Sequence, residues 1–310
     1  MTGKKNVSLP CAVGSTSYID TVKNSYYVDK TLLIRDLIDD HAAVTLFTRP
    51  RRFGKTLAVD MLKVFFEKTD EDNSVYFQDK KIWDCGEFYR KQQGAYPVIY
   101  ITFKDVKFDN WKDSLEAIRL VIRDEYMRHA DILSWDGLDV VEKDYLDRMQ
   151  KGTLSNVEYT RALLNLSRML EKYHNKKIVV LIDEYDTPIQ QGHSKGFYNE
   201  VITFMRNFMS GGLKDNPALA FGVLTGILRV SKENLFSGLN NLVVNSVLDE
   251  KYSEYFGFTS DEVTAMAAYY GREDKLNELR EWYDGYLFGN REIYNPWSVA
   301  NYFNNECKPR

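Results

Sequence analysis

The stretch Thr48-Arg49-Pro50-Arg51-Arg52-Phe53-Gly54-Lys55-Thr56 decides how the rest of the chain is interpreted. It follows the apolar run 44–47 and precedes a segment with the hydrophobic spacing of a helix. Its last three residues match the end of the phosphate-binding loop G-x-x-x-x-G-K-[ST], whose backbone N–H groups and lysine surround phosphate oxygens. Arg49 stands where that pattern has its first glycine. The stretch therefore predicts a nucleoside triphosphate site in a loop of unusual chemistry.

The missing glycine does not remove the phosphate-binding prediction. A residue before proline is extended, so glycine is not needed at position 49. Gly54 lets the backbone approach phosphate, Lys55 is expected to reach the β- and γ-phosphates, and Thr56 is expected to hold Mg²⁺. The residues expected around the nucleotide are Arg49, Arg51, Arg52, Phe53, Gly54, Lys55, Thr56 and Leu57. The alternative, a chance tripeptide with solvated arginines, is disfavoured because strand, loop and helix follow in register.

A second strand end supplies carboxylates. The apolar run 178–182 leads directly into Asp183-Glu184, the pattern that follows the strand of a Walker B motif. Asp183 is expected to share the Mg²⁺ shell with Thr56, and Glu184 to polarise the attacking water as a base. The strand predicted at 97–103 between the two motifs favours the ATPase branch over the kinase–GTPase branch. The alternative is an acidic turn in which Asp186 caps the next segment.

A third strand, 218–224, ends at Thr225. This residue is predicted to face the γ-phosphate or the water. Arg229 either stabilises charge in the transition state or bridges the core to the tail. Arg206 could reach a neighbouring copy as an arginine finger, but a solvated position is the simpler expectation. The predicted catalytic residues are Lys55, Glu184, Thr225 and Arg229.

Strands and helices alternate along the chain, which predicts an α/β fold with a three-layer P-loop NTPase core and a mainly parallel sheet. We expect an irregular N-terminal arm at 1–24, the core at 25–250 and a small helical lid at 251–310. The lid contains a capping-box pattern at Thr259 and Glu262.

The composition excludes several classes of protein. The chain has 310 residues, 44% of them apolar, and a net charge of −4, which argues against one large basic nucleic-acid surface. No apolar run approaches the roughly 20 residues of a membrane span. The three cysteines are far apart and the four histidines show no metal-ligand spacing. We expect a cytoplasmic protein without membrane contact.

The chain resembles the bacterial AAA-ATPase-like family, whose members often carry a C-terminal PD-(D/E)XK nuclease-like domain. The resemblance covers nearly the whole chain and rests on the segments 27–31, 49–56, 181–186, 225–227, 236–241, 282–286 and 294–298. It implies an ATPase core with a lid, in which the arginine-rich loop is the usual form. It also implies that the nuclease-like domain is absent from this chain, which would be truncated or shortened, and that nucleic acid is met only indirectly.

Several hypotheses stay open at this point. Mg²⁺-dependent ATP hydrolysis as a conformational switch is favoured, and a nucleotide-binding scaffold with negligible turnover is the alternative. A nuclease site at Asp249-Glu250-Lys251 is disfavoured because no partner strand is evident. Tyr27 and Lys30 are either base or ribose contacts or ordinary residues, and Asp284 belongs to a lid contact or a turn. The choice between ATP and GTP and the formation of a homo-oligomer are undecided.

Overall fold

Five parallel strands form the central sheet in the computed structural model, which describes residues 9–227, 235, 241–283 and 285–308. Their order is β2-β3-β4-β1-β5. The bounds are β1 (Val44–Thr48), β2 (Val98–Thr102), β3 (Ile178–Asp183), β4 (Leu219–Gly226) and β5 (Leu242–Asn245). Every residue of β1 and β3 is buried, because helices cover both faces of the sheet.

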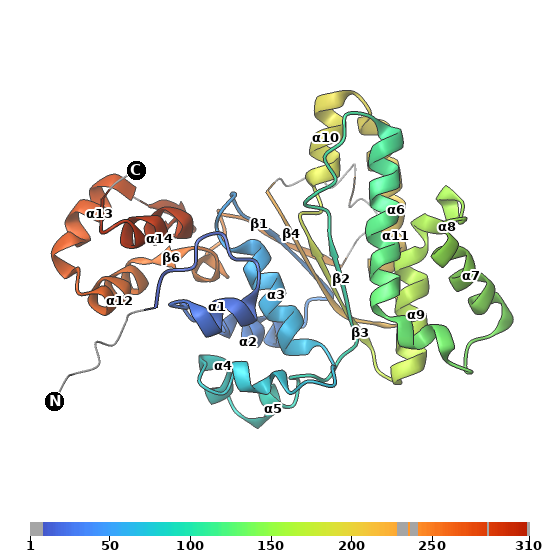
Figure 1. Cartoon of the computed structure of the whole chain (residues 1–310), viewed down its shortest axis with the longest axis horizontal. Helices are drawn as coiled ribbons and strands as arrows, with labels where there is room; N and C mark the ends of the chain where they lie inside the picture. Colours follow the sequence, from blue (N-terminus) through green and yellow to red (C-terminus); the bar gives the residue numbers. More distant parts are fainter. Residues whose placement is uncertain (1–8, 228–234, 236–240, 284, 309–310) are drawn as a thin grey trace.

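Side chains alternate between the two faces of the sheet, and each face has its own helices (Figure 1). Phe47 and Leu181 pack with α2 and α3, whereas Leu46 and Val180 pack with α6, α9 and α11. The helices of the core are α2 (Leu32–Asp39), α3 (Lys55–Phe66), α4 (Lys81–Asp84), α5 (Glu87–Arg90), α6 (Trp111–Arg128), α7 (Val140–Lys151), α8 (Asn156–Thr160), α9 (Ala162–His174), α10 (Thr187–Lys195) and α11 (Tyr198–Leu213). The predicted three-layer α/β core is confirmed.

The lid lies at one end of the molecule, orange to red in Figure 1. It contains α12 (Ser260–Tyr270), α13 (Leu276–Tyr283) and α14 (Pro296–Asn304). The capping box of Thr259 and Glu262 begins α12 as predicted. The lid also has a small antiparallel sheet, in the order β6-β8-β7, formed by β6 (Phe258–Thr259), β7 (Tyr286–Phe288) and β8 (Arg291–Tyr294). The lid is therefore mainly helical, with a small sheet that was not predicted from the sequence.

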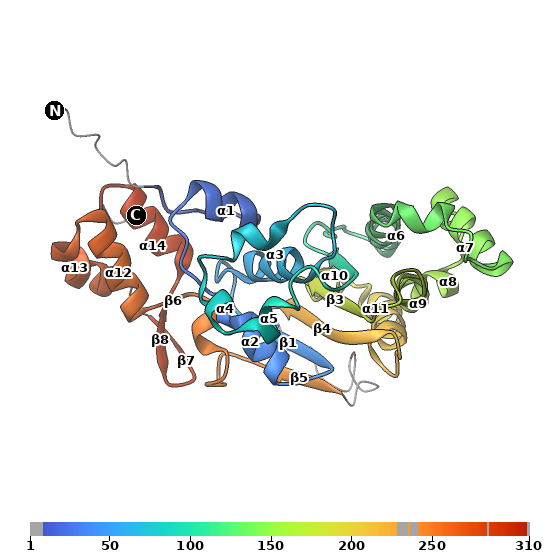
Figure 2. The ribbon, with the colours of Figure 1, turned by 90° about the horizontal axis from the view of Figure 1, so that it is seen from below.

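The last residues of the segment 1–24, which was expected to be irregular, form helix α1 (Tyr18–Asn24). The Ser17 side chain caps this helix, and the Tyr18 N–H donates to the Asp60 carboxylate on α3 at 2.7 Å. Nearer the start of the arm, Cys11 exchanges two hydrogen bonds with the Asn304 side chain of α14, at 3.0 and 2.9 Å. The arm thus joins the lid to α3, as Figure 2 shows from below.

Within the described residues, no helix has both the length and the apolar character needed to cross a bilayer.

Candidate functional site

The carboxyl ends of β1, β3 and β4 bring three sequence-predicted residues into direct contact, since these strands are neighbours in the sheet. The Thr56 hydroxyl donates to Asp183 Oδ2 at 2.7 Å, and the Thr225 hydroxyl donates to Asp183 Oδ1. Asp183 is fully buried. A buried carboxylate is costly unless its oxygens accept hydrogen bonds, so the two threonines hold Asp183 in one orientation.

Lys55 begins α3 directly after Gly54, whose φ of 79° places it in the left-handed region. The lysine is only 6% exposed. Its Nζ donates to the carbonyl oxygens of Arg49 and Pro50, at 3.0 and 2.8 Å. Burial lowers the pKa of Lys55, while the carboxylates of the β3 end oppose that shift. A cation is therefore held at the inner side of the loop, next to the N-terminus of a helix, where an anion is favoured.

Glu184 lies directly after β3 in a conformation rarely adopted by residues other than glycine, with a φ of 50°. Its Oε2 accepts a hydrogen bond from the Thr187 hydroxyl at 3.1 Å. The side chain lines the same cavity as Lys55 and Thr56. Such backbone strain costs about 1–3 kcal/mol and is concentrated at functional sites. The position and strain of Glu184 fit a carboxylate aimed into a reaction site.

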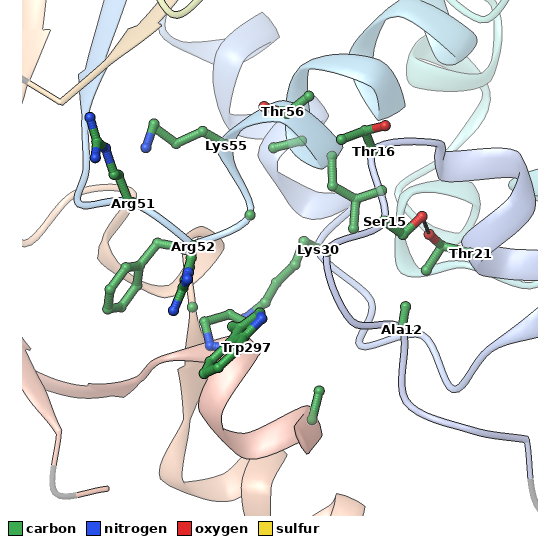
Figure 3. Close-up of a pocket in the computed structure, with 18 of the residues that line it drawn as sticks. Ala12, Ser15, Thr16, Thr21, Lys30, Arg51, Arg52, Lys55, Thr56 and Trp297 are labelled. Atoms are coloured by element: carbon green, nitrogen blue, oxygen red, sulfur yellow. Dashed lines mark hydrogen bonds between the residues drawn. The ribbon is translucent and has the colours of Figure 1, made fainter. Parts of the chain in front are cut away.

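A cavity of about 650 Å³ opens in front of these residues. The loop and α3 form one wall, the N-terminal arm a second and the lid a third (Figure 3). The arm contributes Ala12, Gly14, Ser15 and Thr16, and the lid contributes Met266, Pro296, Trp297 and Ala300. The volume lies in the range of small-molecule sites, which are about 300–1,000 Å³.

Two arginines of the loop face this cavity. Arg51 and Arg52 are exposed and line it. Neither forms an ion pair with a carboxylate in the part of the chain that the structure describes. The Arg52 guanidinium carbon lies 4.1 Å from the centre of the Trp297 ring. The cavity therefore carries positive charge from Arg51 and Arg52 in addition to Lys55.

Arg49 does not face the cavity, which corrects the expectation that it contacts the nucleotide. Its side chain is fully buried. The guanidinium donates to the Thr48 carbonyl at 3.0 Å, to the Asn245 carbonyl at 2.9 Å and to Asn245 Oδ1 at 2.5 Å. It also lies over the rings of Phe256 and Phe288, at 5.0 and 5.5 Å. Arg49 thus joins the loop to β5 and to the start of the lid.

The remaining predicted residues have varied positions. Phe53 is buried against Tyr286 and Phe288 of the lid, although part of it lines the cavity, and Leu57 also lines the cavity. Thr225 does not line the cavity and is 1% exposed, and its hydroxyl orients Asp183. Its predicted place facing the γ-phosphate or the water stays a prediction. Arg229 and Asp284 lie outside the described residues.

Lys30, the segment 249–251 and Arg206 also have defined places in the structure. Lys30 lines the cavity, but its Nζ pairs with Glu262 of the lid at 2.5 Å and donates to the Glu254 carbonyl. The segment 249–251 forms no nuclease-like cluster: its members contact a turn serine, a lid asparagine and Asp40 respectively. Arg206 lies on α11 and is absent from the cavity lining.

The arm and Trp297 are cavity walls that were not predicted from the sequence. The motif 294–298 contains Trp297, and the N-terminal Pro296 and the Asn295 cap indicate a helix start there. Nothing local indicated that this helix start lies next to the loop, because Trp297 lies 245 positions after Arg52.

The parallel sheet, the Gly-Lys-Thr loop after β1 and the acid at the end of β3 define a P-loop NTPase-like core. Residues 12–236 match the family described as "Predicted AAA-ATPase", and the chain belongs to this family. It is also 30% identical over 298 residues to the "Uncharacterized protein in vnfD 5'region" of Azotobacter chroococcum mcd 1. That alignment covers 95% of this chain and 51% of the relative, so the chain spans about half the relative's length. No solved structure matches significantly.

Proposed function

We propose that the chain binds ATP with Mg²⁺ and hydrolyses it, and that turnover acts as a conformational switch for an attached or partner effector. The observation that carries the proposal is the hydrogen-bonded group Thr56–Asp183–Thr225, of which Thr56 lines one cavity together with Lys55 and Glu184. Family membership supports ATPase chemistry as a class.

The side chains fit a Mg²⁺ ion. Asp183 and Thr56 offer a carboxylate and a hydroxyl oxygen, and Mg²⁺ takes such ligands together with water and substrate phosphates. In the described residues, no group of three or more His, Cys, Asp or Glu side chains could hold a metal alone. A bound ion would neutralise charge on the phosphates. Lys55 would then bind phosphate oxygens in place of the carbonyls of Arg49 and Pro50, and Glu184 would accept a proton from water.

The test combines calorimetry with phosphate release. Wild type is expected to bind ATP only weakly without Mg²⁺ and to release phosphate with it. Lys55→Ala should lose binding, whereas Glu184→Gln should keep binding and lose at least about 100-fold in turnover. Lys68→Ala, an exposed lysine just after the same helix, is the matched control. Equal phosphate release by wild type, Lys55→Ala and Glu184→Gln would refute hydrolysis at this site.

The second candidate is a nucleotide-binding scaffold with negligible turnover. The cationic loop, with Arg51 and Arg52 unpaired by carboxylates in the described part, favours tight binding of a polyphosphate. Tight ATP binding without phosphate release would support it. Parallel titrations with GTP decide the base preference.

The effector is proposed to be a further domain or a separate partner. The relative is about twice as long as this chain. A nuclease-like domain, as the resemblance implies, is the specific expectation. Co-expression of the chain with the second half of the relative, followed by purification with and without ATP, would test this proposal.

A further inference from the structure

Three side chains of the phosphate loop hold the lid. Arg49 and Phe53 are buried, and both contact Phe288 of β7. Arg52 is exposed and contacts Trp297 at the start of α14. The contacts of Arg49 and Phe53 with Phe288 are buried. Arg52 and Trp297, in contrast, both line the cavity. Arg52–Trp297 is therefore the loop–lid contact that a ligand in the cavity can compete for.

Arg52 and Trp297 differ in how freely they can move. Trp297 is half-buried and follows Pro296 in the first turn of α14, where its backbone N–H donates to the capping side chain of Asn295 at 3.0 Å, so its backbone position is fixed. Arg52 is exposed and has a long flexible side chain. Figure 3 shows Arg52 reaching from the loop toward Trp297, with Arg51 pointing away from that ring. The guanidinium can therefore move while the backbone that carries the ring stays in place.

We infer that Trp297 is a resting position for the Arg52 guanidinium, and that Arg52 leaves the ring to bind the phosphates of a nucleoside triphosphate. This inference rests on the proposed function and adds its regulation. An exposed cation–π contact is weak, whereas a hydrogen bond between guanidinium and phosphate is charge-assisted and can be bidentate. The Arg52 guanidinium therefore binds a phosphate in preference to the Trp297 ring when a phosphate lies within hydrogen-bond distance.

The competition connects the ligand to the lid. A ligand that takes Arg52 removes one loop–lid contact, so it favours conformations in which α14 is less tightly held. A triphosphate offers more phosphate oxygens than a diphosphate, so it engages Arg52 more often. Trp297 thus acts as a positioning residue that makes the lid sensitive to the phosphate count.

The first experiment uses tryptophan emission of the full chain. Wild type is titrated with a non-hydrolysable ATP analogue and with ADP, each with Mg²⁺, and calorimetry reports binding separately. The analogue should change emission more than ADP does. The change should disappear in Trp297→Phe and in Arg52→Ala, and persist in the matched control Trp282→Phe, another lid tryptophan that is 62% exposed.

The second experiment asks whether substitutions of Arg52 and Trp297 raise or lower the affinity for the nucleotide. Arg52→Ala should weaken binding of the analogue about tenfold and that of ADP less than about twofold. Trp297→Ala should strengthen binding of the analogue about threefold, because the competing contact is gone. Trp297→Phe keeps a ring and should lie between wild type and Trp297→Ala. A merely structural tryptophan would weaken binding when truncated.

The outcomes distinguish a failure of the Arg52–Trp297 inference from a failure of the proposed nucleotide binding. Binding by calorimetry with an unchanged emission response in Trp297→Phe, or weaker binding by folded Trp297→Ala, would overturn the inference alone. Absence of nucleotide binding by wild type would overturn the proposed function and the inference with it.

Discussion

The substitution Arg49→Ala tests whether Arg49 binds phosphate or stabilises the fold. The sequence pattern places Arg49 among phosphate ligands, whereas the structure buries it against Asn245 and two lid rings. Arg49→Ala should therefore lower the free energy of unfolding and leave Lys55 and Thr56 at the wall of the cavity.

The size of the effect follows from the contacts of the guanidinium. Its removal leaves the Asn245 carbonyl and Oδ1 without this donor, at about 1–3 kcal/mol for each buried acceptor. The two ring contacts add about 0.5–1 kcal/mol each. Burial lowers the pKa of Arg49 to about 10, so removal relieves a charge disfavoured by about 3 kcal/mol. These contributions add up to a net loss of about 0–5 kcal/mol, and we expect a value near the middle of that range, about 2–3 kcal/mol.

Urea unfolding followed by circular dichroism measures this loss, with Arg51→Ala as the matched control. Arg51 is exposed and should change stability by less than about 0.5 kcal/mol. A double-mutant cycle with Asn245→Ala should give a coupling of about 1–2 kcal/mol. Unchanged stability of Arg49→Ala together with a loss of nucleotide affinity would refute the structural role.

Three further predictions concern the proposed Mg²⁺ site, the thiols and a capping box. Thr225→Val removes a donor to the buried Asp183 carboxylate and should weaken Mg²⁺ binding about 10-fold or more. Thr225→Ser keeps a hydroxyl and should restore the affinity, and titration of nucleotide binding with Mg²⁺ measures both variants. Burial raises the pKa of the Cys11 thiol to about 11, so at pH 8 a thiol reagent should label the half-buried Cys85 first. Mass spectrometry should find that labelling of Cys11 increases as the pH approaches 11. Arg148, followed by the Ser155 cap, lowers the pKa of Glu158 to about 2. The stabilisation is present above about pH 4.3, the unfolded value, and is lost as pH falls toward 2, so the stability difference between wild type and Glu158→Gln should be larger at pH 7 than at pH 3 in urea unfolding.

Local patterns carried much of the fold prediction. The alternation of strands and helices predicted the three-layer core because a buried parallel strand such as 178–182 has a distinct composition. Thr56 and Asp183 could be paired from the sequence alone because the carboxyl ends of parallel strands lie at one edge of the sheet, although β4 lies between β1 and β3. These inferences need only short segments and the rules of sheet topology.

Long-range contacts explain what could not be predicted from local patterns. An arginine beside Gly-Lys-Thr has the charge of a phosphate ligand, and its actual partner, Asn245, lies 196 positions away. Thr225 was correctly placed at a strand end, but the register that turns its hydroxyl toward Asp183 depends on the pairing of β3 and β4. The arm looked irregular because its stabilising partners, Asp60 and Asn304, lie on α3 and α14.

The backbone of the loop explains why position 49 tolerates an arginine and why position 52 is the more informative one. The Arg49 N–H continues the pairing of β1 with β4 by donating to the Gly226 carbonyl at 3.0 Å, so this position is an extension of the strand. The left-handed positions are Gly54 and Arg52, with φ values of 79° and 69°. Glycine would adopt the conformation of Arg52 without strain, whereas arginine costs about 1–2 kcal/mol there. That cost is offset in part by the contact of Arg52 with Trp297. Since an exposed cation–π contact supplies only about 0.5–1 kcal/mol, it does not cover the strain by itself. A ligand phosphate would supply the stronger partner, which is the physical reason to look for the role of Arg52 in the nucleotide-bound state.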